Sequence, residues 1–174
     1  MIDTLFPSTI RKYSLTDERL KRWATKLYDD EKFNITSPFS LHLTNIDAWV
    51  TELYTDTLTQ LVNDLSLEKT HVAFITDAVV CVLEKGETLQ ICNTLPSHYT
   101  LTHFIKGVTP DIFYHPARSL LEVFNPGHPE WTSASSLYIN EGDAIIHPSY
   151  LDYTTPPVEE RRTTLTLLLQ LQPK

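Results

Sequence analysis

The spacing of apolar residues changes near residue 70, and this change constrains the fold more than any other feature of the chain. Before that point apolar residues recur every three or four positions, as they do in amphipathic helices. After it, short segments rich in β-branched and aromatic residues alternate with turn residues at intervals of about 8 to 12 residues. We therefore expect one α+β domain over residues 1–174, with a helical part at 1–70 and a β-rich part at 71–174.

Two amphipathic helices are expected in the first part. The first is predicted over Leu15–Asp29, with Ser14 as its N-cap, and the second over Ile46–Leu65, with Asn45 as its N-cap. Each has an apolar stripe on one face and charged residues on the other. Both helices are therefore expected to pack on a single sheet.

The second part is expected to form strands joined by short turns. The predicted strands are His71–Ile75, Ala78–Glu84, Thr88–Asn93, Tyr99–Lys106, Ser119–Phe124, Ser135–Ile139, Ala144–His147 and Arg162–Leu171. Lys85 and Gly86 indicate a hairpin turn between the second and third of these. Many short strands separated by turns favour a sandwich or jelly roll over βαβ units.

Composition argues against several classes of partner. Fourteen Lys and Arg against 22 Asp and Glu give a net charge of −8, which disfavours nucleic-acid binding. The four glycines are isolated, so no nucleotide-binding loop is expected. No apolar stretch approaches the roughly 18 residues of a membrane span, and the chain does not start with a secretory signal pattern. We therefore expect no nucleic-acid and no membrane partner.

Common catalytic patterns are also missing from the sequence. The seven histidines form no His-x-His, His-x-Asp or His-Glu-x-x-His motif, and no Gly-x-Ser-x-Gly segment occurs. Cys92 lies six residues before His98, which would allow an activated thiol. A cysteine within an apolar strand is more typical of an inert core residue.

The segment 141–164 combines a tight turn, an apolar strand, a Pro-Ser-aromatic break, a loop and a Glu-Arg pair before the last strand. This arrangement resembles the end of the double-stranded β-helix of small phage-type 2-oxoglutarate/Fe(II) oxygenases. The opening Leu5–Ile10 and the middle segments Lys85-Gly86 and Leu95–Tyr99 resemble the same family. The resemblance implies a double-stranded β-helix, or jelly roll, with two N-terminal helices packed on one sheet.

The family's ligand positions are replaced in this sequence. Its enzymes hold iron through a His-x-Asp pair and a distal His, and counting from the matched segments puts these at Cys92, Thr94 and Tyr153. Arg162 falls where the family's 2-oxoglutarate-binding Arg lies, although it could instead be a surface charge paired with Glu159 or Glu160. We interpret the four residues as vestigial site positions and expect no metal, no other cofactor and no catalytic residues.

The resulting hypothesis is a non-enzymatic structural or interaction protein on an oxygenase-like jelly roll. The phage-type resemblance implies a virion component, such as a neck, tail or capsid accessory subunit, located in the virion or the host cytoplasm. Its partners would be other chains of the assembly or further copies of itself. Aromatic and proline side chains in two loops are the expected contact sites: Phe113, Tyr114, Pro116, Pro126, Pro129 and Trp131.

Two other functions remain open at this point. One is an active Fe(II)/2-oxoglutarate oxygenase that uses unorthodox ligands drawn from His98, His103, His115 and Asp152. The other is a jelly roll that binds a sugar or small ligand through Tyr99, Tyr114, Trp131 and Tyr138. Bound metal would identify the first function, and a concave aromatic pocket would identify the second.

Overall fold

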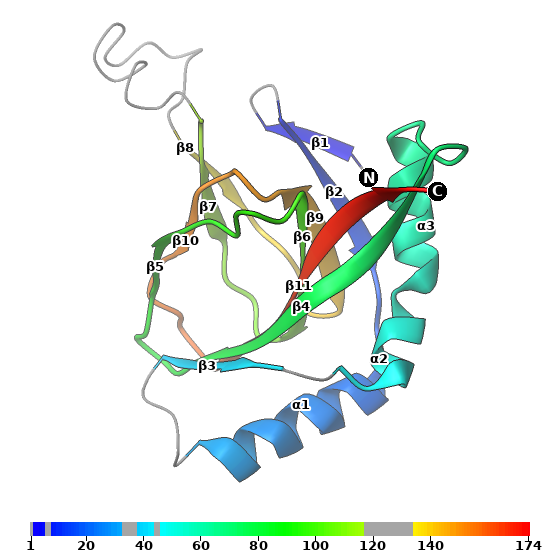
Figure 1. Ribbon diagram of the computed structural model, residues 1–174. Coiled ribbons are helices and arrows are strands. Elements are labelled where there is room, and N and C mark those ends of the chain that lie inside the picture. The colour runs from blue at the N-terminus through cyan, green and yellow to red at the C-terminus, as the bar shows by residue number, and fades with distance from the viewer. Residues whose placement is uncertain (1, 6–7, 33–37, 44–45, 117–133) are drawn as a thin grey trace, which may run out of the picture.

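Two antiparallel sheets face each other and form the body of the protein (Figure 1). The structure is a computed structural model, and it describes residues 2–5, 8–32, 38–43, 46–116 and 134–174. The larger sheet has the order β1-β2-β9-β6-β11-β4-β3, and the smaller has the order β5-β10-β7-β8. Neighbouring strands often come from distant parts of the sequence, as a jelly roll requires.

The strands of the larger sheet are β1 (Ile2–Leu5), β2 (Ser8–Ser14), β9 (Asp143–Pro148), β6 (Tyr99–Lys106), β11 (Arg162–Pro173), β4 (His71–Leu83) and β3 (Phe39–His42). Those of the smaller sheet are β5 (Leu89–Cys92), β10 (Tyr153–Thr155), β7 (Asp111–Tyr114) and β8 (Ala134–Leu137).

Three helices cover the outer face of the larger sheet: α1 (Glu18–Glu31), α2 (Ala48–Leu53) and α3 (Thr55–Asp64) (Figure 1). Their apolar stripes pack on every second residue of the strands. Leu20, Ala24, Val50, Leu58 and Leu61 meet Val80, Leu101, Ile146, Leu165 and Leu167 in one buried cluster. This arrangement agrees with the expected packing of the N-terminal helices on one sheet. No described helix is long and apolar enough to cross a membrane.

A second core fills the space between the two sheets. It contains the buried side chains Ile10, Phe104, Phe113, Ile139, Ile145, Leu151 and Tyr153. Because successive strand residues point to opposite faces, a strand of the larger sheet contributes to both cores. In β9, for example, Ile146 packs under the helices and Ile145 packs between the sheets.

The first helix begins three residues later than predicted. Asp17, not Ser14, is its N-cap, and the Asp17 carboxylate accepts a hydrogen bond of 2.9 Å from the Leu20 N–H. Ser14 instead ends β2, where its hydroxyl donates to Asp143 at 2.7 Å. Strand pairing therefore extends as far as the residue that the sequence indicated as a cap.

The second predicted helix is interrupted at Tyr54, which lies between α2 and α3. Tyr54 is fully buried, and its hydroxyl lies 2.6 Å from His103 Nδ1 on β6. The apolar periodicity continues through the interruption, so it does not reveal the break. Asn45, the predicted cap, lies outside the described residues.

The strand predictions need several corrections. Residues 71–83 form one strand rather than two. Pairing with β11 continues through the expected gap, because Thr76 is accommodated as an extra residue where the register shifts. Five strands were not predicted, because short strands carry little periodic signal: β1, β2, β3, β7 and β10. Three of them, β1, β2 and β3, lie in the part that was expected to be helical. The predicted strand Ser119–Phe124 lies outside the described residues.

Candidate functional site

Cys92 and Tyr153, two of the positions assigned to iron by resemblance, lie side by side in the smaller sheet. Cys92 ends β5, Tyr153 begins β10, and the two are paired across the antiparallel strands. Their side chains also share a hydrogen bond. Tyr153 is buried and Cys92 is half-buried against the core between the sheets. The structure therefore brings these two side chains together at the interior of the jelly roll.

Thr94 is part of a hydroxyl network just beyond β5. Its hydroxyl is hydrogen-bonded to that of Thr100, and the Ser149 hydroxyl lies 2.8 Å from both Thr100 and Ser97. Thr100 and Ser149 are completely buried. Thr94 thus joins the loop to β6 and to the end of β9 through neutral hydrogen bonds.

Arg162 is buried and forms an ion pair with Asp111, which links the two sheets. Its two terminal nitrogens lie 2.6 and 2.9 Å from the two carboxylate oxygens of Asp111, and the exposed fractions are 3% and 1%. Thr155 donates to the same carboxylate at 2.7 Å, and the guanidinium lies 4.7 Å from the Phe104 ring centre. Such bidentate pairs are the strong form of charge-assisted hydrogen bonding.

This pairing corrects the surface alternative considered for Arg162, because its partner is Asp111 rather than Glu159 or Glu160. Asp111 and Thr155 were not among the predicted site residues. Asp111 lies on a four-residue strand, and its distance of 51 positions from Arg162 leaves no local signal.

His147 is a further buried polar side chain of this interior, and it was not among the predicted site residues. Its ring packs edge-on against Phe113 and Tyr153, with ring centres 5.1 and 5.4 Å apart, and Nδ1 lies 3.0 Å from the Pro148 carbonyl oxygen. Burial lowers the pKa of His147 to about 4, because the charged imidazolium would lose its hydration. His147 is therefore neutral near pH 7.

The residues at this interior do not fit an iron site of the His-x-Asp and His type. Burial raises the pKa of the Cys92 thiol and raises that of the Tyr153 hydroxyl well above its ordinary value, so both stay protonated. Thr94 is a neutral hydroxyl. Among the described residues, no three His, Cys, Asp or Glu side chains are close enough to hold a metal ion.

The unorthodox ligands considered for an active oxygenase do not form one set. His103 lies under the helices, where its Nδ1 is hydrogen-bonded to the Tyr54 hydroxyl, whereas His115 directly follows β7 of the smaller sheet. His98 Nδ1 accepts from the Leu171 N–H, and Asp152 accepts from the Asn93 amide at 2.9 Å. His98, His103 and Asp152 therefore take part in separate hydrogen bonds.

The expected contact residues divide into three groups. Phe113 is completely buried in the core between the sheets, so it is a core residue rather than an exposed loop contact. Tyr114 is half-buried and Pro116 is exposed at the end of β7. Pro126, Pro129 and Trp131 lie outside the described residues, so their role stays a prediction.

The aromatic residues considered for sugar binding are not gathered in one pocket. Tyr99 packs against the core under the helices, whereas Tyr138 is 72% exposed at the end of β8. Tyr114 is half-buried at the end of β7, and Trp131, the fourth member of that set, lies outside the described residues.

Comparisons with known proteins identify the fold. No family profile and no curated protein matches the chain. A prolyl-4-hydroxylase from Pseudomonas putida is 10% identical, with a TM-score of 0.57 over 92% of this chain and 91% of that one. The viral collagen prolyl hydroxylase of Paramecium Bursaria Chlorella virus-1, solved with 2OG, is 9% identical, with a TM-score of 0.58 over 92% and 94%. EvdMO1 is 12% identical, with a TM-score of 0.60 over 91% of this chain and 46% of that one.

These likenesses confirm the predicted fold class, a mostly antiparallel jelly roll of the kind found in 2-oxoglutarate/Fe(II) oxygenases. At such low identity they concern the fold alone, and fold does not determine function. Function has to be argued from the residues between the sheets.

Proposed function

We propose that this protein is a non-enzymatic member of the oxygenase-like jelly rolls and that it works through contacts with other proteins. The observation that carries the proposal is the Arg162–Asp111 ion pair. The side chain assigned by resemblance to the carboxylate of 2-oxoglutarate is already bound, through both terminal nitrogens, by a carboxylate of the same chain. An external carboxylate would have to displace a buried and geometrically matched partner.

The neighbouring positions support the same proposal. Cys92, Thr94 and Tyr153 are neutral groups engaged with one another or with nearby hydroxyls, and His147 is enclosed by aromatic rings. Together they form a packed and hydrogen-bonded interior, which suits a scaffold more than an open catalytic cavity. The sequence resemblance to phage-type proteins suggests the setting, a virion component such as a neck, tail or capsid accessory subunit.

Iron binding tests the non-enzymatic role. The protein is loaded anaerobically with Fe(II), with and without 2-oxoglutarate, and bound iron is measured by elemental analysis. We expect wild-type protein to retain no stoichiometric iron. One iron per chain, together with consumption of 2-oxoglutarate, would instead establish the oxygenase alternative.

A gain-of-function variant tests the assigned positions. The triple variant C92H/T94D/Y153H restores the family's ligand types and should gain iron binding if these positions correspond to the metal site. The control I91H/N93D/T154H places the same groups on adjacent residues, which point to the opposite sheet face. Equal iron binding by both triple variants would show that the positions are wrongly assigned.

The structural role is tested separately on protein isolated from its natural source. Native mass determination with identification of co-purifying chains should find it in an assembly with other chains. Isolation as a free monomer would contradict that role.

A further inference from the structure

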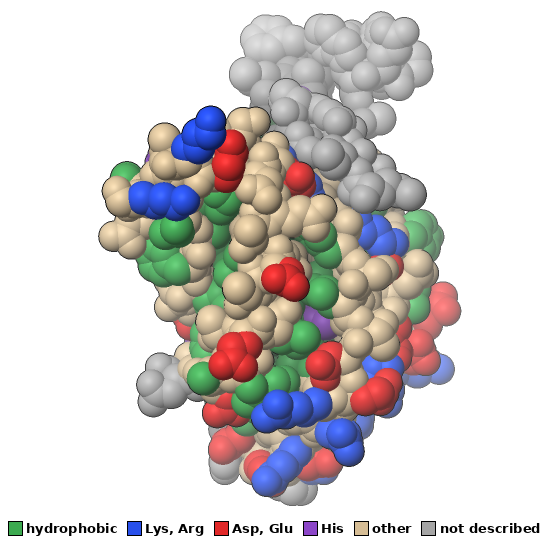
Figure 2. All heavy atoms as spheres, turned by 90° about the vertical axis from the view of Figure 1, so that its right-hand side faces the viewer, with side chains coloured by type: hydrophobic (Ala, Val, Ile, Leu, Met, Phe, Trp, Pro, Cys, Tyr) green, Lys and Arg blue, Asp and Glu red, His purple; other side chains and the backbone are tan. Residues whose placement is uncertain are grey.

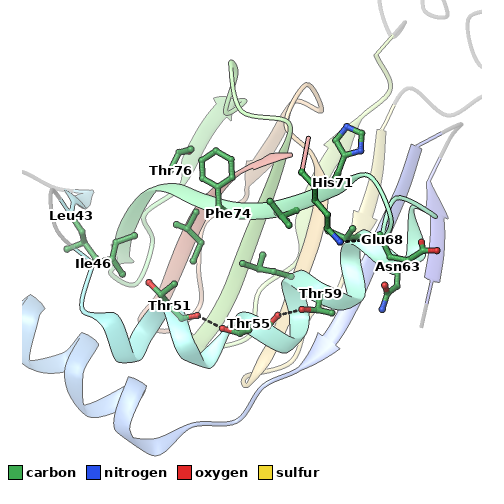
Figure 3. Close-up of a pocket in the computed structure, with 16 residues that line it drawn as sticks. Leu43, Ile46, Thr51, Thr55, Thr59, Asn63, Glu68, His71, Phe74 and Thr76 are labelled. Atoms are coloured by element: carbon green, nitrogen blue, oxygen red, sulfur yellow. Dashed lines mark hydrogen bonds between the residues drawn. The ribbon is translucent and has the colours of Figure 1, made fainter. Parts of the chain in front are cut away.

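A groove of about 620 Å³ lies on the outside of the molecule, between the first half of β4 and the helices α2 and α3 (Figure 3). Its apolar lining comes from Leu43, Ile46, Leu58, Val62 and Ile75. On the same side Phe74 and Val72 are 39% and 43% exposed. The groove therefore presents large apolar side chains to solvent, and it is separate from the interior that contains Arg162.

One wall of the groove is the free edge of a strand. β3 pairs with Val79–Val82 only, so in the described part of the chain residues 72–76 of β4 have β11 on one side and no strand on the other. All five of these consecutive residues line the groove. Successive strand residues point to opposite faces, so a hollow that contacts all five must run along the backbone edge.

The opposite wall is a row of threonines. Thr51, Thr55 and Thr59 are spaced four residues apart on α2 and α3 and point into the groove (Figure 3). The hydroxyls of Thr55 and Thr59 donate to the carbonyl oxygens four residues earlier, at 3.4 and 2.9 Å. Because these two hydroxyl protons already form hydrogen bonds within the helices, they are not available to a ligand in the groove. This wall therefore offers mainly methyl groups.

Charged side chains lie at both ends of the groove. Glu68 and Lys174 line one end, where the Lys174 ammonium donates to the Glu68 carbonyl oxygen. The other end has acidic neighbours, since Glu52 and Asp56 directly follow the groove-lining Thr51 and Thr55 in the sequence. Glu52 and Asp56 are exposed, and neither forms an ion pair with any described residue. Asp77 lies at the end of the free edge, and its carboxylate lies 3.4 Å from Nδ1 of the exposed His42. Figure 2 shows this side of the molecule, with hydrophobic side chains visible beside acidic ones and, at the upper left of the view, beside Lys or Arg.

We propose that this groove binds an extended segment of a partner protein, which adds as a strand to the free edge of β4 and carries Lys or Arg toward Glu52, Asp56 and Asp77. An unpaired strand edge supplies main-chain hydrogen bonds to an extended peptide, and a flanking groove accepts every second side chain. Glu52, Asp56 and Asp77 favour basic side chains at the end of the groove away from Lys174. The inference names the kind of partner and so rests on the proposed role in protein contacts.

The probe for this site is a labelled synthetic peptide that alternates valine with threonine and has two lysines at one end. Binding is followed by fluorescence anisotropy and by NMR of the full-length protein. We expect saturable binding, perturbed amide signals at residues 72–76, and weaker affinity at high salt, which screens the lysines. A peptide with glutamate in place of lysine should bind at least about tenfold more weakly. No perturbation of residues 72–76 by the lysine peptide would overturn the proposal.

A matched pair of variants separates the groove from general charge effects. Thr59→Arg places a long cation in the groove, whereas Gln60→Arg adds the same charge to an exposed position of the same helix that does not line it. We expect Thr59→Arg to weaken peptide binding at least about tenfold and Gln60→Arg to leave it within about twofold. Equal effects of the two variants would overturn the proposal.

Oligomeric state distinguishes a peptide partner from a second copy of this chain. If light scattering shows a wild-type dimer that Thr59→Arg dissociates, the edge pairs with another copy and the peptide proposal fails. The iron measurements above do not depend on this groove. If the protein binds neither peptide nor iron, only the proposal of peptide binding in the groove is rejected. Stoichiometric iron would reject the non-enzymatic role.

Discussion

At the scale of single residues, two buried histidines make stability depend on pH. Burial lowers the pKa of His103 and of His147 from an ordinary value of 6.5 to about 4. Both rings are neutral in the folded protein near pH 7. As the pH falls below 6.5, the unfolded chain takes up these protons before the folded chain does, so the free energy of unfolding decreases.

We therefore expect stability to fall between about pH 6.5 and pH 4, by roughly 3 kcal/mol for each histidine. Urea unfolding at several pH values measures this slope. His147→Asn and His103→Asn should each flatten it, whereas His42→Gln should not, because His42 is exposed. An unchanged slope in both buried-site variants would show that other groups control the acid sensitivity.

At the scale of elements, α3 is expected to stabilise the fold through its apolar stripe. Leu61 is completely buried against the larger sheet, while the adjacent Gln60 is exposed. A carboxylate at position 61 would be buried without a partner, at a cost of several kcal/mol. Leu61→Asp should therefore unfold or aggregate, and Gln60→Asp should change stability by about 0.5 kcal/mol or less.

Circular dichroism and thermal unfolding of the two variants check this expectation. A soluble Leu61→Asp protein with an unchanged midpoint would mean that this face of α3 is not packed on the sheet. The break at Tyr54 does not alter the prediction, because the apolar stripe continues on both sides of it.

At the scale of the whole molecule, the Arg162–Asp111 ion pair connects the two sheets. Asp111 lies on β7 of the smaller sheet, and Arg162 begins β11 of the larger one. Asp111→Ala would leave a buried guanidinium without its carboxylate, which typically costs about 3–5 kcal/mol. We expect chemical denaturation to show a loss of this size.

The exposed pair Arg161–Glu84 is the matched control. It has a similar distance of 2.8 Å, but both side chains are about 40% exposed, at 43% and 41%. Glu84→Ala should cost about 1 kcal/mol or less, because water screens the interaction. Similar losses for the two variants would contradict the structural importance assigned to the buried pair.

Some of the fold could be predicted from the sequence because its signals are local and repeated. The apolar stripes of the helices and the turn-separated strands after residue 70 indicated helices on one sheet of a jelly roll. The position of the first cap and the break at Tyr54 could not be predicted, since pairing between β2 and β9 and the contact of Tyr54 with His103 decide them.

The candidate site likewise has features that the sequence predicts and features that only the tertiary structure decides. The sequence by itself determined the residue types at the positions that the resemblance assigns to iron, which are Cys92, Thr94 and Tyr153. Only the tertiary structure placed Asp111 against Arg162 and enclosed His147 between aromatic rings. Among the described residues, it also left one edge of β4 at residues 72–76 without a strand partner beside α3. These features depend on contacts between residues far apart in the chain, and such contacts leave no periodic pattern in the sequence.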